Sequence, residues 1–161
     1  MREGYDIAQI CINGHPINSS STTYPQYNQD YCDKCGAKAT TICVVCRTSI
    51  RGSYHHPDIV PNIYIPPSYC YKCGHPFPWT EQKIQVAIEL SKEEGQLTDD
   101  DVKELEESIK EIISDTPRTQ LGASRFKRMM NKLGKPTAQA VRDILVDLVS
   151  ETAKKIIWPD K

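Results

Sequence analysis

The sequence has little of what a large hydrophobic core or a membrane span requires. Its 161 residues include only two phenylalanines and two tryptophans. No apolar run approaches the roughly 18 residues of a transmembrane helix. The N-terminal stretch MREGYDIAQICINGHP contains no apolar run of about seven residues, so we expect no secretory signal and a cytoplasmic protein. A chain with so few large apolar side chains needs another source of stability, and bound metal is one.

Strong charge and catalytic motifs are also missing. The formal net charge is −1, which argues against binding a polyanion through overall charge. The sequence contains no glycine-rich phosphate loop, no H-E-x-x-H motif and no H-x-E…P-C-x-x-C motif. We therefore expect a protein that is not an enzyme.

What the sequence does contain is seven cysteines that, with one histidine, form four close pairs. Three pairs have the spacing C-x-x-C and the fourth is C-x-x-x-H. Zn²⁺ prefers four tetrahedral sulfur or nitrogen ligands, so eight donors suit two structural zinc ions. Disulfides are the alternative, but the odd number of cysteines and the expected lack of export disfavour them. The predicted zinc ligands are Cys11, His15, Cys32, Cys35, Cys43, Cys46, Cys70 and Cys73.

Each close ligand pair forms one knuckle, and the four knuckles can be combined into two zinc sites in two ways. In the sequential arrangement the first pair joins the second and the third joins the fourth, which gives tandem zinc ribbons. In the crossed arrangement the first joins the third and the second joins the fourth. We favour the sequential form, because each of its sites then has two knuckles separated by enough chain for a β-hairpin. Among the histidines, His15 is preferred over His55, His56 and His75 because it alone completes a pair with Cys11.

All cysteines precede residue 74, and the pattern becomes charged and helical from about residue 80. We predict a double zinc-ribbon region over residues 1–79 and a four-helix region over residues 80–161. The fold class is thus a small metal-stabilised β-region followed by an all-α region, α+β overall. Short strands are expected over 6–12, 39–44 and 62–65.

Apolar residues at helical spacing predict the four helices. The first runs from about 81 to 94 with Thr80 as its cap, and the second begins after Thr98. The third lies between 116 and 134, and the fourth between 136 and 159. The fourth has a broad aliphatic stripe over 141–157, and the other helices contain few large apolar residues with which to cover it. We therefore expect a homodimer or a protein partner at the third and fourth helices, and no membrane span.

Three segments together resemble an uncharacterised bacterial family of small double zinc-ribbon proteins: CINGHPIN, YCDKCGAKATTICVVCRTSIRG and YCYKCGHPFPWTEQK. The resemblance is close over residues 8–83. It implies the same eight metal ligands and a helix after the P-W-T sequence. Trp79 is expected to pack that helix against the second ribbon. Arg51, in the expected I-R-G turn, is either a solvated charge or a binding residue.

The predicted second and third helices carry opposite charge. Residues 93–115 have ten acidic side chains and two lysines, whereas residues 118–135 have six basic side chains and no acid. The two helices can pair with each other, or the basic helix can contact nucleic acid. The leading hypothesis is a non-enzymatic zinc protein with a partner-recognition surface, and the alternative is nucleic-acid binding with help from ribbon aromatics. The candidate contacts are Arg51, Arg125, Lys127, Arg128 and Lys132.

Overall fold

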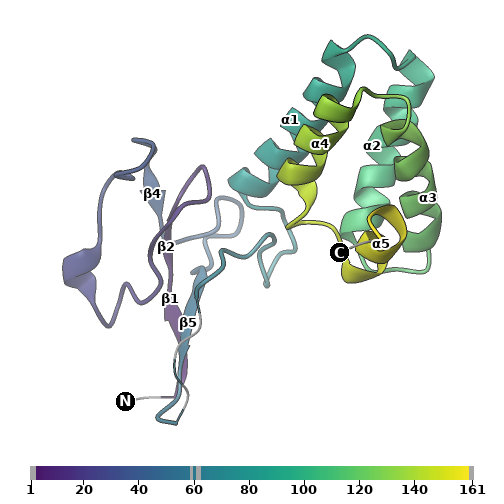
Figure 1. The fold of residues 1–161 in the computed structure, drawn as a ribbon. Coiled ribbons are helices and arrows are strands. Elements are labelled where there is room, and N and C mark those ends of the chain that lie inside the picture. The colour runs from purple at the N-terminus through teal and green to yellow at the C-terminus, as the bar shows by residue number, and fades with distance from the viewer. Residues whose placement is uncertain (1–2, 59, 61–62, 160–161) are drawn as a thin grey trace. The chain divides into compact units, whose positions relative to one another are not determined.

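The structure is a computed structural model that describes residues 3–58, 60 and 63–159 (Figure 1). It divides into two compact units, the head, Met1–Gln82, and the helical unit, Lys83–Lys161. The predicted division after residue 79 lies three residues before this one. The combination of short strands with cysteine clusters and a run of helices confirms the predicted α+β class. None of the described helices has the length and apolar character needed to cross a bilayer.

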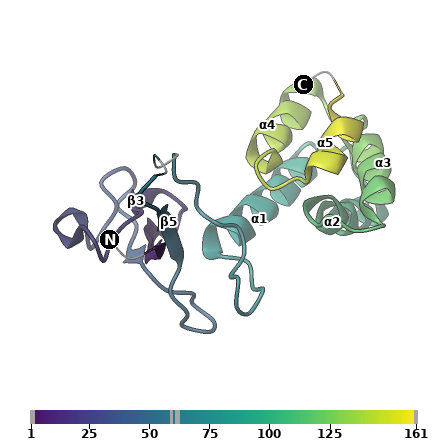
Figure 2. The same ribbon diagram turned by 90° about the horizontal axis from the view of Figure 1, so that it is seen from below.

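The head is built from very short strands joined by long connections (Figure 2). Strands β1 (Gly4–Ile7) and β5 (Arg51–His55) form an antiparallel pair. Strand β2 (Gln9–Cys11) lies between β3 (Pro16–Asn18) and β4 (Ala39–Thr40) in a second antiparallel sheet. A 3₁₀ turn covers Pro25–Tyr27. None of the strands in the described residues of the head is long enough to supply a conventional sheet core.

Three strand predictions need correction. The expected strand 6–12 splits at Ala8 into β1 and β2, because Ala8 N turns aside to bond Ile50 O at 2.9 Å. The expected strand 39–44 ends at residue 40, where the next cysteine knuckle begins to form. Residues 63–65 have no regular structure, and Asn62 lies outside the described residues. Arg51, expected in a turn, instead begins β5.

The core of the head is small. Its buried members are Ala8, Ile10, Cys43, Ile50, Cys70, Phe77 and Trp79. Phe77 and Trp79 stack with ring centroids 4.7 Å apart. Two of the seven members are cysteines, so the packing of this unit depends on where its sulfurs are held.

A buried carboxylate, that of Asp6, joins three separate segments of the head. It accepts bonds from Ile7 N at 2.6 Å, Thr22 N at 3.0 Å and Thr23 N at 3.2 Å, and His55 Nε2 lies 3.3 Å away. Burial opposes ionisation, but the hydrogen bonds from Thr22 and Thr23 prevail and hold the pKa of Asp6 well below its usual range. Asp6 therefore remains charged throughout the neutral range.

Replacing Asp6 with asparagine should destabilise the head by about 1–3 kcal/mol, because two acceptor oxygens become one acceptor and one donor. The folded pKa lies below that of the unfolded chain, so this stabilisation is present at neutral pH and is lost as the pH falls below about 4. Urea unfolding of the metal-loaded protein at pH 7 measures the free energy lost in Asp6→Asn. Asp58→Asn, at an exposed position, is the control, and equal midpoints for the two variants would contradict the expectation.

The helical unit contains five helices within the described residues rather than four. They are α1 (Pro78–Glu93, which begins in the head), α2 (Asp99–Ile113), α3 (Thr119–Met130), α4 (Lys135–Leu145) and α5 (Glu151–Ile157). Helix α1 begins at Pro78 rather than after Thr80; the Thr80 hydroxyl instead donates to Ser68 O at 2.8 Å. Thr98 caps α2 as expected, through a reciprocal pair of bonds with Asp101.

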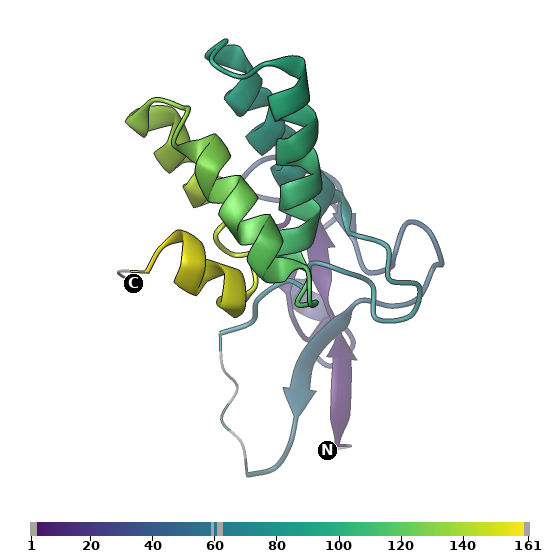
Figure 3. The ribbon, with the colours of Figure 1, turned by 90° about the vertical axis from the view of Figure 1, so that its right-hand side faces the viewer.

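The predicted fourth helix, 136–159, is wrong as one element because it breaks after Leu145. Ser150 caps α5 by accepting a bond from Ala153 N at 3.3 Å, and Ser150 N donates to Ile112 O at 2.9 Å. The break lets α5 fold back beside α3 (Figure 3). Most of the apolar stripe is consequently covered: Val141, Leu145, Val149, Ala153 and Ile157 are buried, and Ile144, Leu148 and Ile156 are half-buried against the same cluster. The described helices therefore leave only a small part of the stripe open, and the interface expected there stays a prediction.

Helices α2 and α3 lie side by side with opposite charges in contact. Arg125 lies 3.9 Å from Glu104 and 3.7 Å from Glu111, and Arg128 also pairs with Glu104. Lys132 Nζ is 2.7 Å from Asp101 Oδ1. Of the four basic residues in or just after α3 that were considered for nucleic-acid contact, three are thus engaged by α2.

Candidate metal centres

The first centre is formed by a hairpin and a knuckle. Strand β2 ends at Cys11 and β3 begins just after His15, and a tight turn closes between them with Cys11 N bonded to His15 O at 3.0 Å. Gly14, with φ of +89°, allows that turn. Strand β4 pairs with β2 so that Ala39 lies opposite Cys11, which brings the preceding Cys32/Cys35 knuckle to the hairpin.

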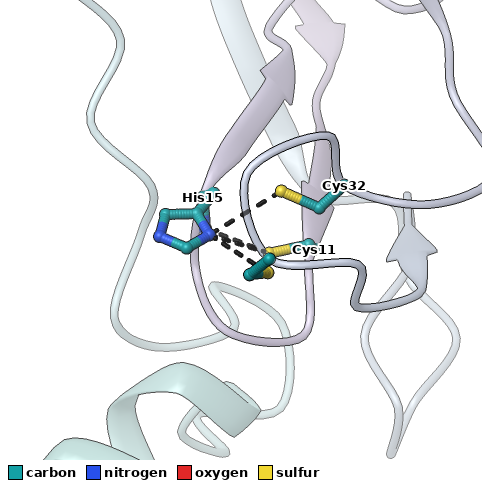
Figure 4. Close-up of side chains that lie close together, drawn as sticks. Cys11, His15 and Cys32 are labelled. Carbon is teal, nitrogen blue, oxygen red and sulfur yellow. Dashed lines mark hydrogen bonds between the residues drawn. The ribbon is translucent and has the colours of Figure 1, made fainter.

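The four donor atoms of this centre lie within 4.8 Å of one another, and Figure 4 shows the Cys11, His15 and Cys32 side chains pointing toward one another. His15 Nδ1 lies 3.5, 3.7 and 3.3 Å from the sulfurs of Cys11, Cys32 and Cys35. The sulfurs of Cys11 and Cys35 are 3.8 Å apart. A tetrahedron with Zn–S bonds of about 2.3 Å has S–S edges of about 3.8 Å and S–N edges of about 3.5 Å. The spacing fits a tetrahedral metal ion.

The second centre joins two knuckles. Cys43 and Cys73 have sulfurs 3.8 Å apart, and Cys46 and Cys70 have sulfurs 3.6 Å apart. A disulfide needs about 2.05 Å, so these sulfurs are not bonded. The structure thus groups the eight predicted donors four and four, in the sequential arrangement and not the crossed one. Each centre has one exposed cysteine, Cys35 in the first and Cys73 in the second.

Three knuckles repeat a single hydrogen-bond pattern, beginning at Cys32, Cys43 and Cys70. In each, the first cysteine N bonds to the carbonyl five residues later, and the amide four residues later returns to the cysteine carbonyl. A bridge between the residue before the cysteine and the residue seven positions further closes each loop. The fifth position has positive φ in all three and is occupied by Gly36, Arg47 and Gly74.

Arg47 is the departure from this pattern, since its φ of 63° lies in the left-handed region that disfavours a side chain. Arg47→Gly should stabilise the metal-loaded head by up to about 1 kcal/mol, after the greater unfolded-state entropy of glycine is deducted. Urea unfolding tests this. Arg47→Ala removes the same charge but keeps the strain, so a gain of equal size in both variants would contradict the backbone explanation.

Backbone amides of the knuckles favour thiolate sulfurs. The Ala37 amide, then the Asn13 side chain, lowers the pKa of Cys35 to about 6. Thr48, through its side chain and then its amide, lowers the pKa of Cys46 to about 6. The His75 amide favours the Cys73 thiolate, but partial desolvation and the sulfurs of Cys46, Cys70 and Cys43 oppose it and raise the pKa of Cys73 to about 12. Without a metal, the close sulfurs of the second centre therefore cannot all be thiolates, because their negative charges repel one another. A bound cation would neutralise this charge.

Trp79 packs against residues of both centres. It is buried in the cluster that includes Cys43 and Cys70 of the second centre, as the sequence predicts. A Cβ added at Gly14, in the hairpin of the first centre, would lie 2.8 Å from Trp79 Cβ. Trp79 Nε1 also donates to Pro67 O at 2.9 Å. The indole is therefore fixed against the hairpin of one centre and the core of the other.

The remaining histidines lie outside both donor sets. His55 pairs with Asp6 and His56 with Glu3, the latter at 3.4 Å. His75 Nε2 is 3.2 Å from Glu81, while its backbone amide serves Cys73, so it supports the metal centre without being one of its donors.

Arg51, singled out from the sequence, lies between two tyrosine rings. Its guanidinium carbon is 3.8 Å from the ring centre of Tyr71 and 5.0 Å from that of Tyr5. The two rings are 55% and 59% exposed, so the stack faces solvent. Sequence reasoning missed Tyr5, because its proximity to Arg51 depends on the pairing of β1 with β5, which no local motif signals.

Comparison with known proteins gives one match. Residues 4–157 match the sequence model of a family described as "Uncharacterized protein conserved in bacteria (DUF2321)". No curated protein and no solved structure matches the chain. The match covers nearly the whole chain, including both cysteine clusters and all five helices.

Proposed function

The chain belongs to this uncharacterised bacterial family, and we propose that it is a non-enzymatic protein in which two structural zinc ions hold a recognition surface. The head is a pair of zinc ribbons in tandem, and the helical unit binds a protein partner or a second copy of the chain. The reduced thiol ligands suit a reducing compartment, so we assign the protein to the cytoplasm.

One observation carries this proposal: the eight donors are divided into two complete sets of four. A structural zinc site is closed by four protein ligands, whereas a catalytic site keeps one position for water or substrate. Here the fourth position of each set is filled by a cysteine or histidine side chain. The role that follows is to hold the loops in place.

The donor types favour zinc over other metals. The first set is three thiolates and an imidazole and the second is four thiolates. Soft sulfur donors in tetrahedral geometry select zinc or iron and disfavour magnesium and calcium, which take oxygen ligands. Tetrathiolate iron is coloured and zinc is not, so the absorption spectrum distinguishes them.

Elemental analysis of the purified protein should find two zinc ions per chain. Cys11→Ser and Cys70→Ser should each lower the content to about one, because each removes a donor from a different centre. A folded, unmodified protein with one zinc ion, or with none, would contradict the two-centre proposal.

A second candidate function is nucleic-acid binding, and the exposed Tyr5–Arg51–Tyr71 stack is the observation that favours it. Aromatic and guanidinium faces stack on unpaired bases, with about 1–3 kcal/mol for each base. A salt-sensitive mobility shift with mixed single-stranded DNA and RNA, lost in Arg51→Ala but retained in Lys34→Ala, would support it. The basic residues of α3 add little, because α2 engages most of them.

A further inference from the structure

A hollow of about 570 Å³ lies in the helical unit where α3 ends, α4 begins and α5 ends. Its apolar lining includes Met130, Leu133 and Trp158, and three cationic side chains reach it: Lys127, Lys135 and Arg142. This volume is within the range of roughly 300–1,000 Å³ that is typical of ligand pockets. Among residues up to 159 that the structure describes, the lining contains no carboxylate.

These three cations differ from the other basic residues nearby. Arg118, Arg125, Arg128 and Lys132 all lie within 4.0 Å of an acidic side chain of α2. Among residues 3–58, 60 and 63–159, no carboxylate lies that close to Lys127, Lys135 or Arg142. The nearest acid along α4, Asp143, accepts a bond from Gln139 Nε2 at 2.7 Å. Within the described part of the chain, positive charge is therefore uncompensated at this hollow, whereas acidic side chains of α2 neutralise it on the neighbouring face of α3.

Two of the cations are held in position. The Arg142 guanidinium lies over the Trp158 ring at 5.2 Å, and that ring in turn makes an edge contact with buried Phe126 at 6.4 Å. Lys127 Nζ lies 3.5 Å from the Ile156 carbonyl near the end of α5. A guanidinium fixed on an aromatic ring offers two parallel donors to a carboxylate with little loss of entropy.

The start of α4 is already occupied, which makes phosphate a poor match. Glu94 Oε2 accepts from Gly134 N at 2.8 Å, and its other oxygen accepts from the Thr137 hydroxyl. Free backbone amides at a helix start are what usually cradle a phosphate. Here Glu94 uses that site and would repel an added anion there. The remaining donors are separate side chains around an apolar floor, which suit carboxylates spaced along a flexible chain.

We propose that this hollow binds an acidic peptide segment of a partner protein, with one large apolar side chain on the floor and glutamate or aspartate side chains at Lys127, Lys135 and Arg142. This inference rests on the proposed function, because it names the chemistry by which the helical unit would recognise its protein partner. Charge complementarity gives selectivity and speed of association, and the apolar contact gives residence time.

The test uses the full-length, metal-loaded protein and a fluorescent pentapeptide with two glutamates on each side of one phenylalanine. Anisotropy should show saturable binding that weakens as salt is added. Replacing the glutamates with glutamine, or the phenylalanine with glycine, should each weaken binding by about tenfold or more. The double variant Lys127→Gln/Arg142→Gln should lose binding to a similar extent. Lys110→Gln/Lys155→Gln removes the same charge outside the hollow and should bind like the wild type.

Three results would overturn the inference. The first is no binding of the glutamate peptide at millimolar concentration. The second is equal loss in both double variants, which would indicate general charge attraction. The third is displacement of the peptide by inorganic pyrophosphate at lower concentration than by free glutamate, which would make this a phosphate site. Zinc content is measured on the same samples. Two zinc ions with no peptide binding would reject this inference and leave the proposed function standing.

Discussion

Removing the metal should unfold the head and leave the helical unit folded. The head has a core of seven buried hydrophobic side chains, two of which are cysteines that belong to the second centre. Without a cation, four sulfurs within 4.8 Å of one another must share protons or repel as thiolates. Structural zinc sites contribute about 10–16 kcal/mol in small domains, more than a core of this size can replace.

The measurement is amide hydrogen exchange after chelation. Amides of β1, β2 and β5 should lose protection, whereas those of α2, α3 and α4 should retain it. Cys43→Ser removes a ligand of the second centre alone, so without chelator it should lose protection in β1 and β5 while the first centre keeps its zinc ion, because the buried Cys43 sulfur is both ligand and core. Val45→Ser changes a 55% exposed side chain of the same knuckle and should have little effect. A chelated protein whose head amides stay protected would show that the metal is not what folds the head.

Leu145→Asp should destabilise the helical unit by about 3–5 kcal/mol, because it places an unpaired charge at a fully buried position. Leu145 belongs to the same cluster as Leu105, Ile109 and Phe126, so water cannot reach an aspartate there without opening the packing. Thermal unfolding of the helical signal should show a large fall in midpoint.

Gln139→Asp is the matched control for Leu145→Asp. It places the same charge on the same helix at an exposed position, and because it replaces the Gln139–Asp143 hydrogen bond with a like-charge pair, we expect a loss of about 1 kcal/mol, well below that of Leu145→Asp. Similar losses in both variants would mean that the buried face of α4 has been assigned wrongly. The metal content of both variants should stay at the wild-type value, since neither residue belongs to the head.

The donor pairs could be read from the sequence because metal ligation imposes short spacings that need no knowledge of the fold. The assignment of pairs to centres needed more, since both arrangements were compatible with the gaps, and it followed only from the pairing of β2 with β4. The break between α4 and α5 was missed because the aliphatic rhythm continues across it. Ser150 was the local signal, as a cap with its side-chain acceptor aimed at Ala153 N.

The charges on α2 and α3 illustrate a different limit. Their opposite signs were plain in the sequence, but the sequence could not say whether the basic residues face an acid or solvent. In the structure, Arg125, Arg128 and Lys132 form ion pairs with acidic side chains of α2, whereas Lys127 lines the hollow. Whether a basic residue meets an acid depends on the helix face that it occupies after packing. A shift of one residue along the helix moves a side chain to a different face.

The uneven exposure of the sulfurs determines how the two centres would exchange their metal over time. Cys35 and Cys73 meet solvent, whereas Cys11, Cys32, Cys43 and Cys70 are buried. An incoming thiol or oxidant can reach the two exposed sulfurs without displacing core side chains, so ligand exchange and oxidation would start at Cys35 and Cys73. Each centre would therefore lose its metal stepwise, first at its exposed sulfur and only then at the half-buried ligand, His15 in the first centre and Cys46 in the second.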